Sequence, residues 1–127
     1  MAIRTELKLS LQNNPGTLAR MCRLLADEQV NIIAMALSQG FVVRMVVDNP
    51  VHAAATLREH HYQVEEREVL YTLTPNDRGA LARFARLIAD SGINVEYLYT
   101  TAVEDGDMAA IVVGVPDVRR ASAAAGV

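Results

Sequence analysis

The stretch that decides the fold is GTLARMCRLLADEQVN, from Gly16 to Asn31, because the chain contains it twice. The second copy runs from Gly79 to Asn94 and reads GALARFARLIADSGIN. The two copies align without a gap at an offset of 63 residues, the distance from Gly16 to Gly79. A repeat of this length indicates two copies of one supersecondary unit that bury apolar surface against each other.

The composition fits a soluble chain of two small modules. It has 127 residues, of which 51% are hydrophobic and 21% charged, so it has enough apolar residues for packed cores. A net charge of −3 argues against nucleic acid, whose partners present a basic face. No apolar run is long enough to span a membrane, and the N-terminus lacks a signal-peptide core. We expect a cytoplasmic protein, and the single Cys22 agrees with a reducing compartment.

The first copy sits between a strand and a hairpin. Apolar and polar residues alternate from Thr5 to Gln12, which predicts a half-buried strand. Asn14 is expected as the N-cap and Pro15 as the first residue of a helix that continues to about Glu28. Residues 31–38 and 41–48 are rich in apolar side chains and are separated by Gln39-Gly40, which predicts a hairpin.

A second helix and a long strand complete the first module. Asn49-Pro50 repeats the combination of cap and proline and predicts a helix that ends near His60-His61. Residues 62–74 contain neither Gly nor Pro and alternate like a strand. This segment must supply both the last strand of the first module and the first strand of the second.

The second copy predicts the same order of elements: a helix over 77–90, strands over 94–102 and 108–113, and a helix over 117–125. The predicted fold class is therefore α+β, with two ferredoxin-like βαββαβ modules in tandem, each an antiparallel sheet with helices on one face. The modules are expected at residues 1–68 and 69–127. The second is expected to lack its last strand, which would leave an open edge on the strand over 69–74 that invites pairing with another chain.

The repeated glycines and asparagines suggest a binding site. With helices starting at residues 15 and 78, Gly16 and Gly79 fall in the first helical turn, where φ is negative and any residue fits. The remaining reason for glycine is close approach of a ligand to the free N–H groups, where a small carboxylate suits both the space and the charge. The amides of Asn31 and Asn94 suit the two charged groups of a zwitterion. Alternatively, each Asn forms an Asx turn and each Gly makes room for a neighbouring strand.

These residues resemble the ACT domain family, whose members are amino-acid-sensing modules with the βαββαβ fold. The resemblance lies in the loop Asn13-x-Pro15-Gly16, the helix that follows it, and Val30-Asn31-Ile32, and it recurs in residues 78–82 and 92–97. It covers almost the whole chain as two tandem copies. The chain is similar to stand-alone tandem ACT proteins without a catalytic domain.

The resemblance implies a ligand held between two modules, by the strand-helix loop of one and the start of the second strand of the other. On this sequence it implicates two sets of residues: Asn13, Asn14, Pro15, Gly16, Thr17 and Leu18 with Asn94 and Val95, and Asn76, Asp77, Arg78, Gly79, Ala80 and Leu81 with Asn31 and Ile32. The copies differ from the family pattern, since Asn14 replaces the usual loop acid and Arg78 the usual proline. The two sites therefore need not share one affinity or one ligand.

Other kinds of site find less support in the sequence. Cys22 lies on the apolar helix face, where packing is the simpler explanation, and His52, His60 and His61 lack metal-ligand spacing. Tyr97 and Tyr99 share a strand face, but RNA-binding sheets add a basic surface and a third aromatic. We expect no catalytic residue, no metal and no cofactor.

The preferred function is a non-enzymatic sensor in which an amino acid binds between ACT modules and regulates amino-acid metabolism. The chain is expected to form a homodimer and to act on a partner enzyme, without nucleic acid or membrane partners. One alternative is a protein-interaction module that binds no small molecule. Another is an acylphosphatase-like hydrolase, for which Arg78 in the second loop is a weak signal.

Overall fold

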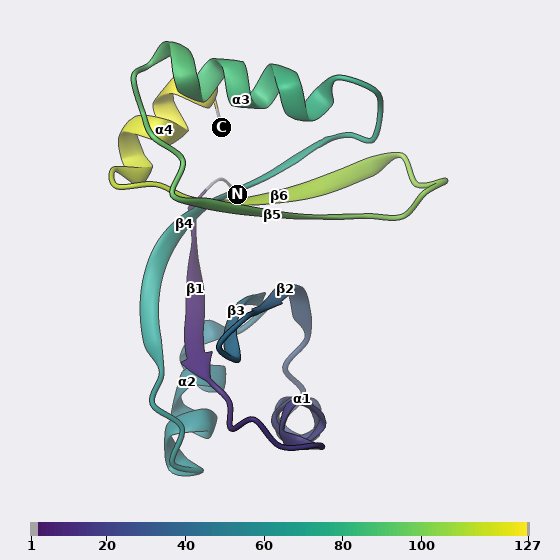
Figure 1. Ribbon diagram of the computed structural model, residues 1–127, viewed down its shortest axis with the longest axis vertical. Coiled ribbons are helices and arrows are strands. Elements are labelled where there is room, and N and C mark those ends of the chain that lie inside the picture. The colour runs from purple at the N-terminus through teal and green to yellow at the C-terminus, as the bar shows by residue number, and fades with distance from the viewer. Residues whose placement is uncertain (1–2, 127) are drawn as a thin grey trace. The chain divides into compact units, whose positions relative to one another are not determined.

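The computed structural model describes residues 3–126 and contains two compact units (Figure 1). One unit, here the N-terminal module, consists of residues 5–67. The other, here the C-terminal module, consists of residues 68–126 together with residues 3 and 4. None of the helices in the described residues combines the length and hydrophobicity that a membrane span needs.

The N-terminal module contains β1 (Ile3–Ser10), α1 (Thr17–Asp27), β2 (Ile32–Ser38), β3 (Val42–Val47), α2 (Pro50–Glu59) and the start of β4 (Glu65–Pro75). Its strand order is β2-β3-β1-β4, and β3 pairs antiparallel with both β1 and β2. This is the predicted βαββαβ order. The Gln39-Gly40 hairpin is confirmed.

Period-two alternation in β1 and β3 builds the core of this module. Leu7 pairs with Met45 and Leu9 with Val43, and all four side chains are buried. They pack in one cluster with apolar side chains of α1 and α2, including Leu25. Burying one such side chain contributes about 1.5–3 kcal/mol, so this layer accounts for much of the stability of the module.

The C-terminal module repeats the design with β4, α3 (Ala80–Asp90), β5 (Tyr97–Ala102), β6 (Met108–Gly114) and α4 (Val118–Ala125). β6 lies between β4 and β5 and is antiparallel to both. Figure 1 shows α3 and α4 on the same face of this sheet. Their apolar faces bury a core with Leu70, Ile111 and Val113.

The sequence predicted that the C-terminal module lacks its last strand beside β4. In the structure, the start of β1 lies at that position. β1 neighbours β4, and its residues Ile3 and Arg4 belong to this module. The Arg4 guanidinium lies over the Tyr71 ring, 4.7 Å from its centroid. The edge of β4 that the sequence left open is therefore covered where β1 begins.

The starts of α1 and α3 differ from the sequence prediction. Gly16 and Gly79 are the N-cap residues, and their φ values are 87° and 86°. The prediction that Asn14 caps α1 and that both glycines have negative φ was wrong. Left-handed backbone is costly for residues with a Cβ, so conformation alone accounts for both glycines.

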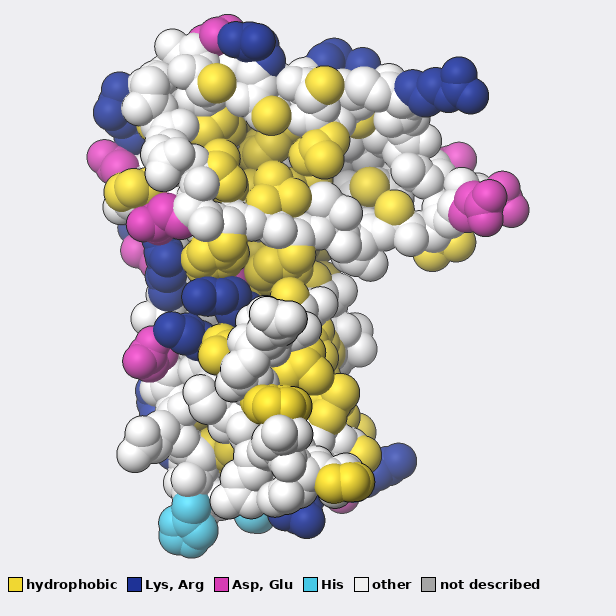
Figure 2. Space-filling view, in the orientation of Figure 1, with side chains coloured by type: hydrophobic (Ala, Val, Ile, Leu, Met, Phe, Trp, Pro, Cys, Tyr) yellow, Lys and Arg dark blue, Asp and Glu magenta, His cyan; other side chains and the backbone are white. Residues whose placement is uncertain are grey.

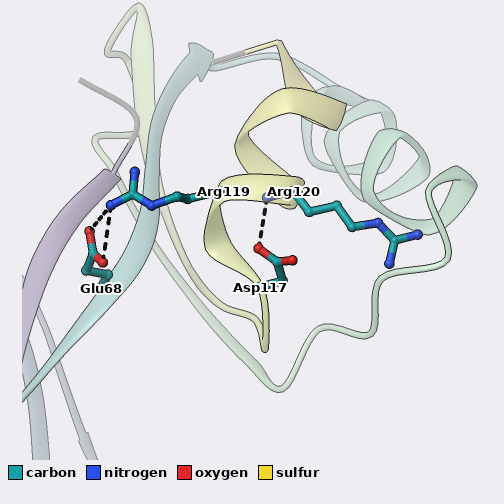
Figure 3. Close-up of polar contacts among 4 residues, drawn as sticks. All are labelled: Glu68, Asp117, Arg119 and Arg120. Carbon is teal, nitrogen blue, oxygen red and sulfur yellow. Dashed lines mark hydrogen bonds and ion pairs between the residues drawn. The ribbon is translucent and has the colours of Figure 1, made fainter.

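The other two helices begin with side-chain caps. The Asn49 side chain accepts a hydrogen bond from His52 N at 3.2 Å, with Pro50 at the first helical position, which confirms the prediction for α2. The Asp117 carboxylate accepts from Arg120 N at 3.1 Å (Figure 3). Figure 3 also shows Arg119 of α4 paired with Glu68 of β4, at 3.2 Å.

Substituting the capping glycines should destabilise the protein without altering its fold. Gly16→Ala and Gly79→Ala each place a Cβ on left-handed backbone, which costs about 1–2 kcal/mol. Denaturant unfolding measures this cost. Gly16→Asn should lower the free energy of unfolding by less, because Asn tolerates left-handed backbone better than Ala does. If Gly16→Ala is as stable as the wild type, a left-handed conformation is not the reason for glycine at this position.

Gly114→Ala should destabilise the C-terminal module. Gly114 pairs with Tyr97, and a Cβ at position 114 would overlap the Tyr97 ring. Overpacking of this kind costs about 1–3 kcal/mol. A double-mutant cycle with Tyr97→Ala tests the cause, since Gly114→Ala should cost little once the ring is gone. An equal cost in both backgrounds would rule out the ring as the reason.

Candidate functional site

The loop before α1 is held by short hydrogen bonds. Thr17 Oγ1 lies 2.9 Å from the Gln12 carbonyl oxygen and 3.2 Å from that of Asn14. Asn14 N donates to the same Gln12 oxygen at 2.9 Å, and Arg20 N donates to Gly16 O at 2.9 Å. These bonds close a compact turn from the end of β1 to the first turn of α1.

The loop before α3 is fixed differently. The Asn76 side-chain amide donates to Val103 O at 2.8 Å and to Gly106 O at 3.0 Å, so it holds the β5–β6 hairpin. Asp77 Oδ1 lies 2.9 Å from Arg83 Nη2. Asn76 therefore already has a structural role, which the sequence did not indicate.

The helix starts fall into two classes. α2 and α4 have side-chain caps, whereas α1 and α3 have none, and no acidic residue lies in the first turn of any of these four helices. The first N–H groups of a helix have no partner within it and carry a partial positive charge. The repeated loops thus present N–H groups that a bound anion would satisfy.

The remaining predicted residues lie where β2 begins and in the segment before β5. Asn31 N donates to Asp48 Oδ1 at 3.0 Å, and Asp48 N donates back to Asn31 O at 3.0 Å. The backbone of Asn31 thus joins the start of β2 to the end of β3. Asn94 and Val95 precede β5, so the strand predicted over 94–102 is confirmed from Tyr97 to Ala102, and its predicted start at Asn94 was wrong.

A groove in the N-terminal module was not predicted. Its volume is about 930 Å³, and it is lined by β1, α1 and the segment from α2 to β4. Of the predicted site residues, only Thr17 lines it. The groove depends on how the segment after α2 runs past β1, which no local motif encodes.

Cys22 and the histidines do not form a reactive site. Cys22 is half-buried, and burial raises the pKa of its thiol, which disfavours the nucleophilic thiolate. His52 Nε2 lies 3.5 Å from Glu28 Oε1, and His60 Nδ1 lies 3.0 Å from Thr56 O. Across residues 3–126, no three His, Cys, Asp or Glu side chains cluster in a way that could hold a metal ion.

Comparison with solved structures supports the fold. A protein of Bacteroides thetaiotaomicron is 25% identical, with a TM-score of 0.88 over 97% of this chain and 86% of that chain. The regulatory subunit of aspartate kinase from Thermus flavus is 12% identical, with a TM-score of 0.67 over 99% of this chain and 95% of that chain. The Thermus thermophilus subunit, in a ligand-free form, is 14% identical, with a TM-score of 0.68 over 98% and 90%. At 12% and 14% identity the likeness establishes the fold alone.

No curated protein matches the chain. A family model described as an ACT domain pair matches residues 1–121, nearly the whole chain and both copies of the repeat. The βαββαβ order of both modules agrees with that match. The chain therefore belongs to the ACT domain pair family.

Proposed function

We propose that this protein is a non-catalytic regulator that binds a free amino acid at the starts of α1 and α3. The observation that carries the proposal is the contrast among the four helix starts. α2 and α4 are capped by their own Asn49 and Asp117, whereas α1 and α3 follow the repeated loops and have no side-chain cap. The carboxylate of a bound ligand would accept hydrogen bonds from the N–H groups that no side chain caps at these two helix starts.

The chemistry of the proposed site is electrostatic. The N–H groups of Leu18 and Ala19 in α1, and of Leu81 and Ala82 in α3, belong to the first turns, where a helix supplies no acceptor. A carboxylate near such N–H groups gains about 0.3–1 kcal/mol from the macrodipole alone. At the α1 loop, the exposed Asn13 supplies a further polar group for the amino end of the ligand.

The two loops should not bind equally. In the second loop Asp77 carries a negative charge and pairs with Arg83, whereas Asn14 occupies the corresponding position in the first loop. A carboxylate ligand meets less repulsion at α1 than at α3. We therefore assign the higher affinity to the α1 loop.

Regulation would act through a partner. The Thermus proteins of the same fold are regulatory subunits of aspartate kinase, which makes an enzyme of amino-acid metabolism the first partner to test. We further propose that the chain acts as a homodimer. The second candidate is a scaffold that mediates protein contacts and binds no small molecule. It is favoured by Asn76, a predicted ligand-binding residue whose side-chain amide instead holds the β5–β6 hairpin.

A thermal-shift screen with the twenty common amino acids tests the proposal. A ligand present at 100 times its Kd stabilises the folded protein by about 2.7 kcal/mol, which raises the Tm by several degrees. At least one amino acid should do so. If none raises the Tm, and calorimetry detects no binding, the scaffold function is favoured instead.

Ala19→Asp should separate folding from binding. Ala19 is exposed in the first turn of α1, so a carboxylate there stabilises the helix by about 0.3–1 kcal/mol and repels a bound carboxylate. We expect unchanged or higher stability and at least about tenfold weaker amino-acid binding by calorimetry, or about 1.4 kcal/mol. Ala19→Asn is the neutral control and should bind nearly as wild type does. If the Ala19→Asp and Ala19→Asn variants bind the amino acid with equal affinity, the ligand does not bind at the start of α1.

A further inference from the structure

The groove in the N-terminal module has the size of a small-molecule site. Its volume of about 930 Å³ lies in the range of 300–1,000 Å³ typical of such pockets. One wall is the end of β1, another is α1, and the third is the segment of residues 60–64 after α2 together with Glu65 at the start of β4. Leu9, Leu24 and Tyr62 supply an apolar part of the lining.

The charged side chains around the groove leave an excess of positive charge. Lys8 pairs with Glu65 at 3.7 Å, and Arg23 pairs with Asp27 at 3.8 Å. These two pairs account for both carboxylates of the lining, which also includes Arg20, His60 and His61. In Figure 2, drawn in the orientation of Figure 1, histidine side chains lie exposed around α2.

Comparison of the two copies shows why Arg20 is available. Arg20 corresponds to Arg83 at the repeat offset, and Asn14 corresponds to Asp77. In the C-terminal module Asp77 pairs with Arg83 at 2.9 Å. The N-terminal copy has an amide at the position of that acid, and within the described residues Arg20 has no ion pair. The first copy therefore has a free guanidinium beside the groove where the second copy has a neutralised one.

The wall opposite α1 is held in place by α2. Tyr62 N donates to Leu57 O at 3.0 Å, and Arg58 Nη2 donates to Val64 O at 2.9 Å. Between these bonds His61 adopts a φ of 71°, in the left-handed region that glycine occupies at lower cost. His61 therefore lines the groove at a position where glycine would cost less.

We propose that this groove binds a small organic anion, a phosphate monoester or a carboxylate, that carries an apolar group. Arg20, with His60 and His61, receives the anionic end, and the partly buried Leu24 and Tyr62 contact the apolar end. The site is separate from the amino-acid site proposed at the helix starts, since it uses the side chains of the groove and needs no α-amino group. Either site would exist without the other.

Phenyl phosphate and phenylacetate are suitable probes, and the three histidines of the chain report on them. In NMR titrations at millimolar probe, the imidazole signals of His60 and His61 should shift, whereas His52, which does not line the groove, should not. Stronger binding of phenyl phosphate identifies a phosphate monoester as the ligand type, and stronger binding of phenylacetate identifies a carboxylate.

Three variants test the assignment of residues. Arg20→Ala should weaken probe binding roughly fivefold, as expected for losing one partly exposed ion pair. Arg86→Ala is the matched control, because it removes the same charge from an exposed position on α3 and should leave binding unchanged. His61→Gly should raise the Tm by removing left-handed strain and should still weaken binding, which a purely structural histidine would not do.

Three results would overturn the proposal. They are no shift of the His60 and His61 signals with either probe, an equal shift of His52, and equal loss of affinity in Arg20→Ala and Arg86→Ala. The last two would indicate general attraction of anions to the surface. Binding of amino acids at the helix starts would not support the groove proposal, because it concerns the other site.

Discussion

The structure depends on a left-handed glycine at the start of one helix in each module. Gly16 and Gly79 turn the chain from a strand into α1 and α3 at φ values of 87° and 86°. A Cβ at these positions would raise the energy of the turn that aims the apolar helix face at the sheet. Since glycine has no side-chain acceptor, the same choice leaves the first N–H groups uncapped. One conformational requirement thus both shapes the turn into each helix and creates the feature on which the proposed amino-acid site rests.

Duplication followed by divergence explains how the modules differ. Both modules have the glycine and the arginine one turn later. Asp77 pairs with Arg83, whereas Asn14 stands at the equivalent position and Arg20 has no ion pair within residues 3–126. A single change from acid to amide alters the charge at a helix start and at the groove beside it. The order of strands and helices is the same in both modules, so the difference lies in the charges that the two equivalent loops present.

The two longest strands, β1 and β4, each contribute residues to both modules. β4 runs through 11 residues without a break, and its first residues belong to the N-terminal module while the rest belong to the C-terminal module. β1 is divided in the same way, with Ile3 and Arg4 in the C-terminal module. β4 therefore has a neighbouring strand on each side, β1 and β6.

The sequence alone determined the α+β class, the duplicated order of elements, the Gln39-Gly40 hairpin and the cap at Asn49, because hydrophobic period, turn residues and caps act over a few neighbours. It also marked the two glycine loops, but it gave the glycines the wrong backbone conformation, since sequence does not show where the first helical turn closes. Only the tertiary structure decided that β1 covers the edge of β4, that Asn76 holds a hairpin 27 residues away, and that Arg20 lies beside a groove. These features join residues distant in the chain, and the energy that selects them comes from packing of whole elements rather than from local preference.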